Sequence, residues 1–338
     1  MASHFAAARP QVRHRRQPCP VPDAHAGRML DRRDPTTSLT GRAFTTATAR
    51  DHGVTDRMLR SARFVRLHPR VWRLGATELT PRLQLEAAVL AAPGRAVLSH
   101  VTALDWLLGT DRLAAVVHLS TDSTAQTVLQ GVRLHRRRHA LAPRPVRGIA
   151  CLGPERTFVD CATVLGLRRL VRAGDALSRA GLTTPARLVR YADEHHLDGV
   201  IRAREAAHLV RPRVDSPRET DVRLLIVAAG LPEPETNVEL LDDRGQWVAR
   251  GDLVLPAWRV VVEHDGWVHE RDAVQRQKDH LRRERIHAAG WTLVVITVAD
   301  FERPASIAWR AHAALVARGY RGPRPSFGSL WARVRRDM

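Results

Sequence analysis

Residues 247–265 read WVARGDLVLPAWRVVVEHD, two apolar runs on either side of Pro256. Two short runs rich in β-branched residues, separated by a few residues that include proline, are typical of a β-hairpin. If a four-residue loop begins at Pro256, the strand pairing places Asp252 opposite Glu263. Because side chains alternate along a strand, Asp265 shares the face of Glu263. Three converging carboxylates repel one another, and a hard divalent cation is the usual relief. The stretch therefore predicts a metal-binding hairpin.

The segments on both sides predict the order helix, hairpin, helix, strand. Upstream, Ser216 is placed as the N-cap of a helix, with proline at the first helical position and Glu219 at the third. Downstream, residues 271–289 are polar with apolar residues at intervals and end at Gly290, as an exposed helix with a glycine cap does. Residues 291–297 are almost continuously apolar, which indicates a strand buried on both faces. This order is the core of the PD-(D/E)XK nuclease fold.

Residues 216–300 resemble a family of uncharacterised domains related to the very short patch repair endonucleases. The matching positions are 216–219, 230–232, 252–254, 262–267, 269, 279, 282 and 290–291. The resemblance implies a restriction-endonuclease-like α/β/α domain that hydrolyses phosphodiesters with Mg²⁺ or Mn²⁺, with Asp252 and Glu263 as metal ligands. The chain departs from the Glu-x-Lys motif of this superfamily, because Asp265 stands where the lysine is expected. The role of that lysine must come from elsewhere in the chain or is absent.

Four further residues are candidates for this site, each with a second interpretation. Asp265 or Glu219 completes the metal shell directly or through water, while Glu219 is equally placed to close the capping box. Histidine in general changes charge near neutral pH, so His269 could orient or activate a water molecule, although a lone histidine is more often incidental. Lys278 is the only lysine in the chain. Its compact ammonium could stabilise developing charge, and the alternative is a solvated helix residue.

Residues 44–75 predict a small winged helix-turn-helix. A threonine at 45 or 46 caps a first helix that ends near Gly53, Thr55 caps a second helix, and residues 65–74 form the hairpin that would be the wing. This segment resembles the N-terminal domain of abortive-infection type IV antitoxins, which are DNA-binding autoregulators. The resemblance implies DNA contact by two arginines of the second helix and two of the hairpin, Arg57, Arg60, Arg66 and Arg70. The alternative is that these arginines are solvated.

Between these two parts, residues 79–209 predict an α/β region. Expected elements are helices at 80–92 and 99–108, strands at 115–119 and 128–134, a helical stretch from 156 to 180, and a helix capped by residue 183 or 184. Arg156, Thr157 and Asp160 resemble the middle part of the antitoxin-like proteins. Asp160 and Asp175 are interpreted as structural or surface acids, and the basic run 136–139 as a surface loop, with phosphate binding as its alternative.

The fold class is therefore α+β with several domains. Residues 1–40 are predicted to be disordered, 41–78 to form the winged helix-turn-helix, 79–209 the middle region and 210–338 the endonuclease-like domain, with 210–215 as a linker. Met29 is an alternative start, which would leave residues 1–28 outside the native protein.

The charge balance favours a polyanionic partner. Lysine and arginine total 54 against 35 acidic residues, a formal net charge of +19, so DNA is the expected partner. An anionic membrane surface is disfavoured because no basic amphipathic helix with a clean apolar face is evident, and no stretch is long enough for a membrane span. Three cysteines without CxxC spacing are typical of reduced thiols, so a cytoplasmic protein is expected.

Two functions follow from the sequence. The first is a DNA-binding, metal-dependent endonuclease, which the acids Asp252 and Glu263 favour. The second is a non-catalytic, antitoxin-like DNA-binding regulator with a degenerate nuclease fold, which Asp265 in the lysine position favours. A toxin partner and a homodimer both stay open.

Overall fold

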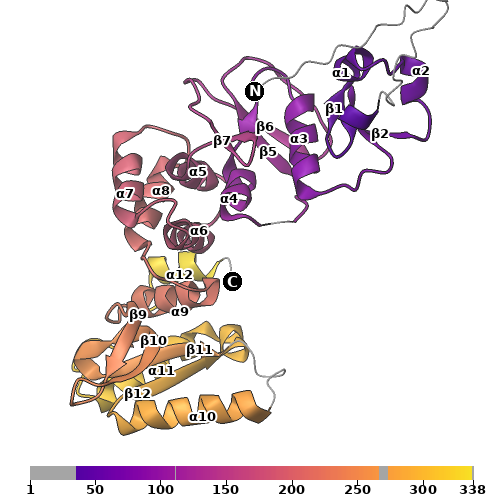
Figure 1. Cartoon of the computed structure of the whole chain (residues 1–338). Coiled ribbons are helices and arrows are strands. Elements are labelled where there is room, and N and C mark those ends of the chain that lie inside the picture. Colours follow the sequence, from indigo (N-terminus) through magenta and orange to yellow (C-terminus); the bar gives the residue numbers. More distant parts are fainter. Residues whose placement is uncertain (1–35, 111, 266–272, 337–338) are drawn as a thin grey trace, which may run out of the picture.

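A computed structural model describes residues 36–336, apart from residue 111 and residues 266–272. Within this part the protein is a mixed α+β chain with three sheets, arranged one after another from the N-terminal to the C-terminal part (Figure 1). None of the described helices combines the length and the apolar character that crossing a membrane requires.

The first sheet has the order β1-β3-β2. Its elements are η1 (Thr37–Leu39), β1 (Phe44–Thr45), α1 (Thr46–Asp51), α2 (Asp56–Leu59), β2 (Phe64–His68) and β3 (Val71–Leu74). Both predicted caps are present, because the hydroxyl of Thr45 accepts a hydrogen bond from the backbone N–H of Thr48 and that of Thr55 accepts one from Met58. The disorder predicted for residues 1–40 is wrong for residues 36–40, since η1 is formed and Leu39 is fully buried. Residues 1–35, including the alternative start at Met29, lie outside the described residues.

The second sheet has the order β6-β5-β4-β8-β7. Its elements are α3 (Pro81–Ala91), β4 (Val97–Leu98), α4 (His100–Leu108), β5 (Val117–Thr121), β6 (Val132–Arg136), β7 (Arg144–Val146) and β8 (Ile149–Cys151). The strand predicted at 128–134 begins at Val132 instead, because Gly131 turns the chain in the left-handed region at φ 74°. Val128, although β-branched, is exposed.

Four helices follow this sheet: α5 (Pro154–Cys161), α6 (Leu167–Arg179), α7 (Pro185–Glu194) and α8 (Val200–Leu209). The helical stretch predicted from 156 to 180 is thus two helices, since the chain leaves the helix after Cys161 and Gly166 caps α6 with an extended backbone. The cap predicted at residue 183 or 184 is Thr184, whose hydroxyl accepts a hydrogen bond from Arg187 N.

The third sheet has the order β12-β11-β10-β9. Its part of the chain contains α9 (Pro217–Ala228), β9 (Glu235–Leu241), β10 (Trp247–Leu255), η2 (Pro256–Trp258), β11 (Val260–Asp265), α10 (Ala273–Ala288), β12 (Thr292–Thr297), η3 (Val298–Glu302), α11 (Pro304–Ala317) and α12 (Ser329–Arg335). The predicted order helix, hairpin, helix, strand is confirmed, and so is the pairing of Leu255 with Val260. Strand β9, which the sequence did not indicate, extends the hairpin on its far edge.

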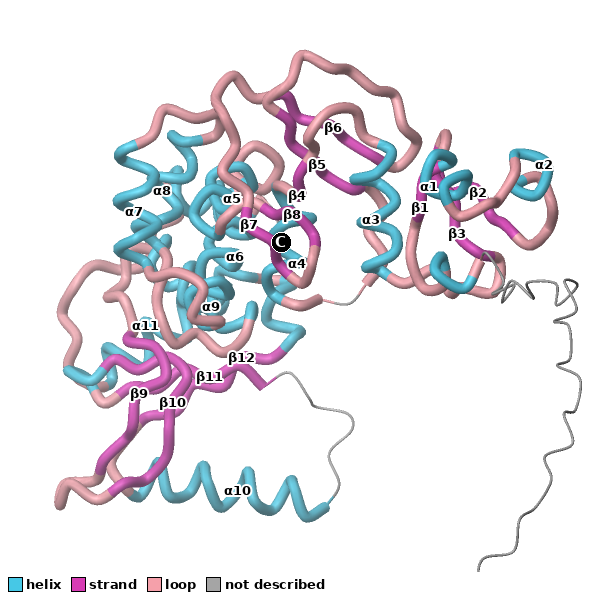
Figure 2. Tube along the Cα trace, turned by 45° about the horizontal axis from the view of Figure 1, so that its top comes forward, coloured by secondary structure: helices cyan, strands magenta, loops and turns pink. Residues whose placement is uncertain are grey.

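The two faces of this sheet are covered by different helices. Val254 and Val261 pack with Ile286 of α10, whereas Leu253 and Val262 belong to the core shared with α9 and α11. Figure 2 shows α10 on one side of the strands and α9 and α11 on the other. The hairpin is therefore the middle layer of a helix–sheet–helix arrangement.

The segment predicted as a linker, 210–215, is packed. Val210 and Val214 are buried, and Val210 belongs to a hydrophobic core to which helices α6 and α9 both contribute. Polar groups join the same helices: Arg223 of α9, fully buried, lies 3.0 Å from Asp175 of α6. The helices of the middle region and the third sheet thus form one continuous core.

Candidate functional site

Asp252 and Glu263 lie on neighbouring strands of the predicted hairpin. Leu253 pairs with Val262 and both enter the core with α9 and α11, so the residues flanking this pair point to the α10 face. Gly251 lets the strands approach, because a Cβ there would lie 2.8 Å from Val254 Cγ2 and 2.9 Å from Val261 Cγ1. The sequence pattern therefore places the two carboxylates on one face.

These acids line a cavity of about 200 Å³ between the sheet and α10. It is lined by Asp252, Glu263, Asp265 and the α10 residues Asp279, Arg282 and Arg283, together with His264 and Val295. The three carboxylates predicted to converge thus share one cavity. We call it the carboxylate cavity.

Two of its carboxylates are neutralised by arginines of α10. Arg282 donates from both terminal nitrogens to Glu263, at 2.7 Å each, and this pairing raises the pKa of the guanidinium. Arg283 lies 2.9 Å from Asp265. Arg282 also donates to the backbone carbonyl of Arg250 at 2.7 Å, which ties α10 to β10. These contacts make α10 the positively charged wall of the cavity.

Asp252 is the acid without such a partner. Among the described residues its carboxylate accepts one long hydrogen bond, 3.4 Å from the backbone N–H of His264. Burial is the largest cause that raises the pKa of Asp252 to about 7, and the negative charges of Glu263 and Glu219 raise it further. A half-buried carboxyl group that ionises only near neutrality is a position where a bound cation lowers the free energy.

Glu219 of α9 is buried and supports the site from the other side. Its Oε2 accepts hydrogen bonds from Asp215 N at 2.9 Å and from the Asn237 side-chain amide of β9 at 3.0 Å. Ser216 accepts from Glu219 N at 3.2 Å, as predicted for the N-cap, but Glu219 reaches Asp215 rather than the N–H of Ser216. Glu219 therefore caps the start of α9 by binding the N–H of Asp215 instead of that of Ser216, and its negative charge helps to raise the pKa of Asp252.

Asp252, Glu263, Asp265 and Glu219 do not bring three carboxylate oxygens close enough together to bind one metal ion without rearrangement. Within the part of the chain that the structure describes, three or more His, Cys, Asp or Glu ligand atoms come within 4.8 Å of one another only at a group of histidines in the second sheet. Glu263 and Asp265 are instead paired with Arg282 and Arg283 of α10. The cavity offers a cation one or two carboxylates, which is the number that Mg²⁺ commonly takes from protein before substrate phosphate completes its shell.

Lys278 is exposed on α10 and does not line the carboxylate cavity. Arg282 and Arg283 supply the positive charge there, through their ion pairs with Glu263 and Asp265. Their position was readable from helix periodicity: Ile286 is buried, and residues three and four positions before it share its face. His264 is a further lining residue that the sequence did not single out, and His269 lies outside the described residues.

The four arginines predicted to contact DNA are exposed on α2 and on the β2–β3 hairpin, and none forms an ion pair within the described residues: Arg57, Arg60, Arg66 and Arg70. Near them, Arg50 binds Asp56 through two nitrogens at 3.0 and 2.7 Å, which braces α1 against α2. The first sheet thus presents positive charge to solvent.

No protein-family model matches the chain. It is similar to two uncharacterized proteins of Mycobacterium tuberculosis, one from strain CDC 1551 / Oshkosh and one from strain ATCC 25618 / H37Rv. Each is 25% identical over 233 residues, which cover 64% of this chain and 85% of the relative. The similarity thus extends over most of each relative, and their descriptions name no activity.

Proposed function

We propose that the protein is a DNA-binding, divalent-metal-dependent endonuclease whose site is the carboxylate cavity. The observation that carries the proposal is Asp252, a half-buried acid beside Glu263 that forms no ion pair within the described residues and has a pKa raised to about 7. The order of elements around it, α9, β9, β10, β11, α10 and β12, supports the same function because it agrees with the nuclease core that the sequence resembles.

Asp252 and Glu263 are the residues that would hold Mg²⁺ or Mn²⁺. When bound, such a cation polarises a phosphoryl oxygen and lowers the pKa of a water molecule. Glu219 and Asp265 set the negative potential of the cavity, directly or through water. Arg282 holds Glu263 by two hydrogen bonds and provides positive charge on the α10 side, the role that a lysine has in the motif of the superfamily.

DNA is the substrate that the charge distribution supports. The formal net charge of +19 attracts a polyanion, and the exposed arginines of the first sheet are suited to phosphate contact. A chain with this charge is expected to bind duplex DNA strongly at low salt and more weakly as counterions compete.

The second candidate function is a non-catalytic DNA-binding regulator. It is favoured by the arginines that already neutralise Glu263 and Asp265, since a carboxylate held by a guanidinium is less available to a metal. In this case the carboxylate cavity is a structural remnant, and the function lies in the exposed arginines of the first sheet.

Cleavage of labelled duplex and single-stranded DNA in Mg²⁺ or Mn²⁺ separates the two candidates. We expect wild type to cleave only with metal and Asp252→Ala to lose at least about 100-fold in rate. The matched control is Asp243→Ala, because Asp243 is an exposed acid of the same domain and should leave the rate unchanged. DNA binding without cleavage by wild type, in either metal, would establish the regulator instead.

The DNA contact is tested by the salt dependence of binding. Replacing Arg57 and Arg60 by glutamine removes two positive charges, so the slope of log affinity against log salt should become shallower by about 1.8. The control replaces Arg321 and Arg324, which are exposed in the C-terminal part of the chain. A slope that changes equally in both double variants would assign binding to overall charge rather than to the first sheet.

A further inference from the structure

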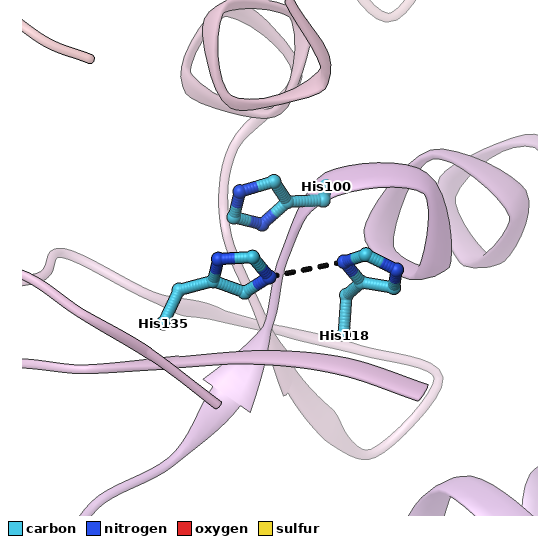
Figure 3. Close-up of side chains that lie close together, drawn as sticks. All are labelled: His100, His118 and His135. Atoms are coloured by element: carbon cyan, nitrogen blue, oxygen red, sulfur yellow. Dashed lines mark hydrogen bonds between the residues drawn. The ribbon is translucent and has the colours of Figure 1, made fainter. Parts of the chain in front are cut away.

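A second cluster of ligating side chains lies in the middle sheet. His100 begins α4, His118 lies on β5 and His135 on β6 (Figure 3). Their ligand nitrogens lie within 4.8 Å of one another, and no other described residues bring three such ligands together. None of the three lines the carboxylate cavity, so what they do is independent of the proposed nuclease site.

Strand pairing brings His118 and His135 together. Strands β5 and β6 are parallel, with Ser120 opposite His135, and His118 precedes Ser120 by two positions and so shares its face. The Nδ1 of His118 and the Nε2 of His135 form a hydrogen bond of 3.0 Å (Figure 3), so one of the two nitrogens carries a proton that a metal ion would replace. Two nitrogens that bind one tetrahedral Zn²⁺ lie about 3.3 Å apart, from Zn–N bonds of about 2.0–2.1 Å. The two rings are thus separated nearly as two ligands of one ion are.

The third ring is held against two local preferences. His100 has φ 53°, in the left-handed region, where a residue other than glycine is strained. Ser99 stands at the N-cap of α4 but makes no capping hydrogen bond, because its hydroxyl lies 2.9 Å from His100 Nδ1. Such a cap stabilises the start of a helix when it is made, and α4 lacks it. In return, the ring of His100 stacks on His135 with centroids 3.7 Å apart.

His100 presents a nitrogen lone pair to the cluster. Arg137 contacts His100 Nε2 at 3.0 Å, and because arginine only donates, Nε2 carries the lone pair and Nδ1–H points to Ser99. Burial is the largest cause that lowers the pKa of His100 to about 2 and that of His135 to about 4, and it lowers the pKa of His118 as well. Burial thus favours the neutral imidazole, the form in which histidine binds transition metals.

Two buried oxygens beside the cluster have no hydrogen-bond partner among the described residues: Ser120 Oγ and Asp160 Oδ2. Ser120 is fully buried and pairs with His135, and Asp160 is 1% exposed. The other oxygen of Asp160 accepts from Arg137 at 3.1 Å, and Arg137 is the residue that touches His100. Buried oxygens without a partner are rare in native structures, and a cation with its bound water would satisfy them.

We propose that His100, His118 and His135 bind one divalent transition-metal ion of the Zn²⁺ class. The ion joins α4 to β5 and β6 through three neutral nitrogen ligands, with the negative charge of Asp160 close to the ligand set. Binding replaces two hydrogen bonds with metal bonds: the one from Arg137 to His100 Nε2 and the one between His118 and His135. Arg137 keeps its ion pairs with Asp160 and with Asp198, the latter at 2.9 Å. Three histidines leave a further coordination position open, as in catalytic zinc sites.

The test is metal binding by the full chain, purified without a histidine tag. Zinc content is measured by mass spectrometry after dialysis, and Co²⁺ is then titrated into chelated protein while the visible absorption of four-coordinate Co²⁺ is recorded. We expect one zinc per chain and a cobalt spectrum that zinc abolishes. His118→Gln and His135→Gln should each weaken binding by more than about 100-fold, the upper end of what losing a residue behind a ligand costs.

Two controls separate this site from others. His139→Gln changes an exposed histidine four residues after His135 and should retain the metal. Asp252→Asn should also retain it, because the carboxylate cavity is a different site. Wild-type protein without bound zinc and without a four-coordinate cobalt spectrum overturns the proposal. So does unchanged binding in His118→Gln and His135→Gln, and because wild type alone can overturn it, the test does not depend on how well the variants fold.

Discussion

Replacing Asp252 by asparagine should stabilise the protein when no metal is present. The substitution removes one negative charge at nearly constant volume from a half-buried position next to Glu263 and within the field of Glu219. The asparagine side chain is neutral and resembles the protonated form of the acid. The variant therefore lacks the cost of ionising a carboxyl group in this cavity.

The magnitude follows from the pKa. Burial and the neighbouring carboxylates raise the pKa of Asp252 from 3.8 to about 7 in the folded protein. A group whose folded pKa is raised binds its proton more tightly in the folded state, so stability is highest below pH 3.8 and is lost as the pH rises through 7. Each pKa unit corresponds to about 1.4 kcal/mol, so the ionised carboxylate costs up to about 4 kcal/mol at pH 8. The variant should recover most of this.

Urea unfolding in EDTA at pH 5 and pH 8 measures the effect. We expect Asp252→Asn to exceed wild type in free energy of unfolding at pH 8, with a much smaller difference at pH 5. Millimolar Mg²⁺ or Mn²⁺ should then raise the melting temperature of wild type but not of the variant, because a ligand that binds only the folded state stabilises it. A variant that is less stable than wild type at pH 8, with no response to metal in either protein, would refute both the electrostatic reasoning and the metal site.

Three further substitutions test the surroundings of the site by urea or thermal unfolding. Arg282→Gln leaves Glu263 without its cation and should cost about 2 kcal/mol without metal, a loss that Mg²⁺ reduces; a loss unaffected by Mg²⁺ would contradict this. Asp221→Asn leaves the buried Arg168 and the partly exposed Arg172 of α6 facing an uncharged amide and should cost about 3–5 kcal/mol. A loss below about 1 kcal/mol would show that α6 and α9 do not depend on this contact. Gly251→Ala should cost about 1–3 kcal/mol, because the added methyl group overpacks against Val254 and Val261. An unchanged stability would show that these strands move apart enough to accept it.

Local rules account for what the sequence predicted correctly. The caps at Thr55 and Ser216 depend on a few neighbouring residues, and so does the turn at Pro256. Once the turn is placed, the two-residue period of a strand puts Asp252 and Glu263 on one face without any knowledge of the rest of the chain. This is why the β10–β11 hairpin and the shared face of its two acids could be predicted from 19 consecutive residues, 247–265.

Contacts between distant segments decided the rest. Lys278 was a predicted site residue because it is the only lysine in the chain. The burial of Ile286 instead sets the rotation of α10 so that Arg282 and Arg283 face the carboxylate cavity. The linker proposed at 210–215 is polar in sequence, and only the packing of α6 against α9 shows that it lies within a continuous core.

The histidine cluster shows most clearly which features could not be predicted from the sequence alone. By itself the sequence determined where helices and strands begin and the alternation of faces, because those depend on neighbours a few residues apart. His100, His118 and His135 follow no ligand spacing along the chain, and they meet only because β5 pairs in parallel with β6 and α4 packs on β5. Which of many scattered histidines and arginines share a site is set by strand pairing and helix packing across long stretches of chain, and those follow from the burial of the whole core rather than from any local pattern.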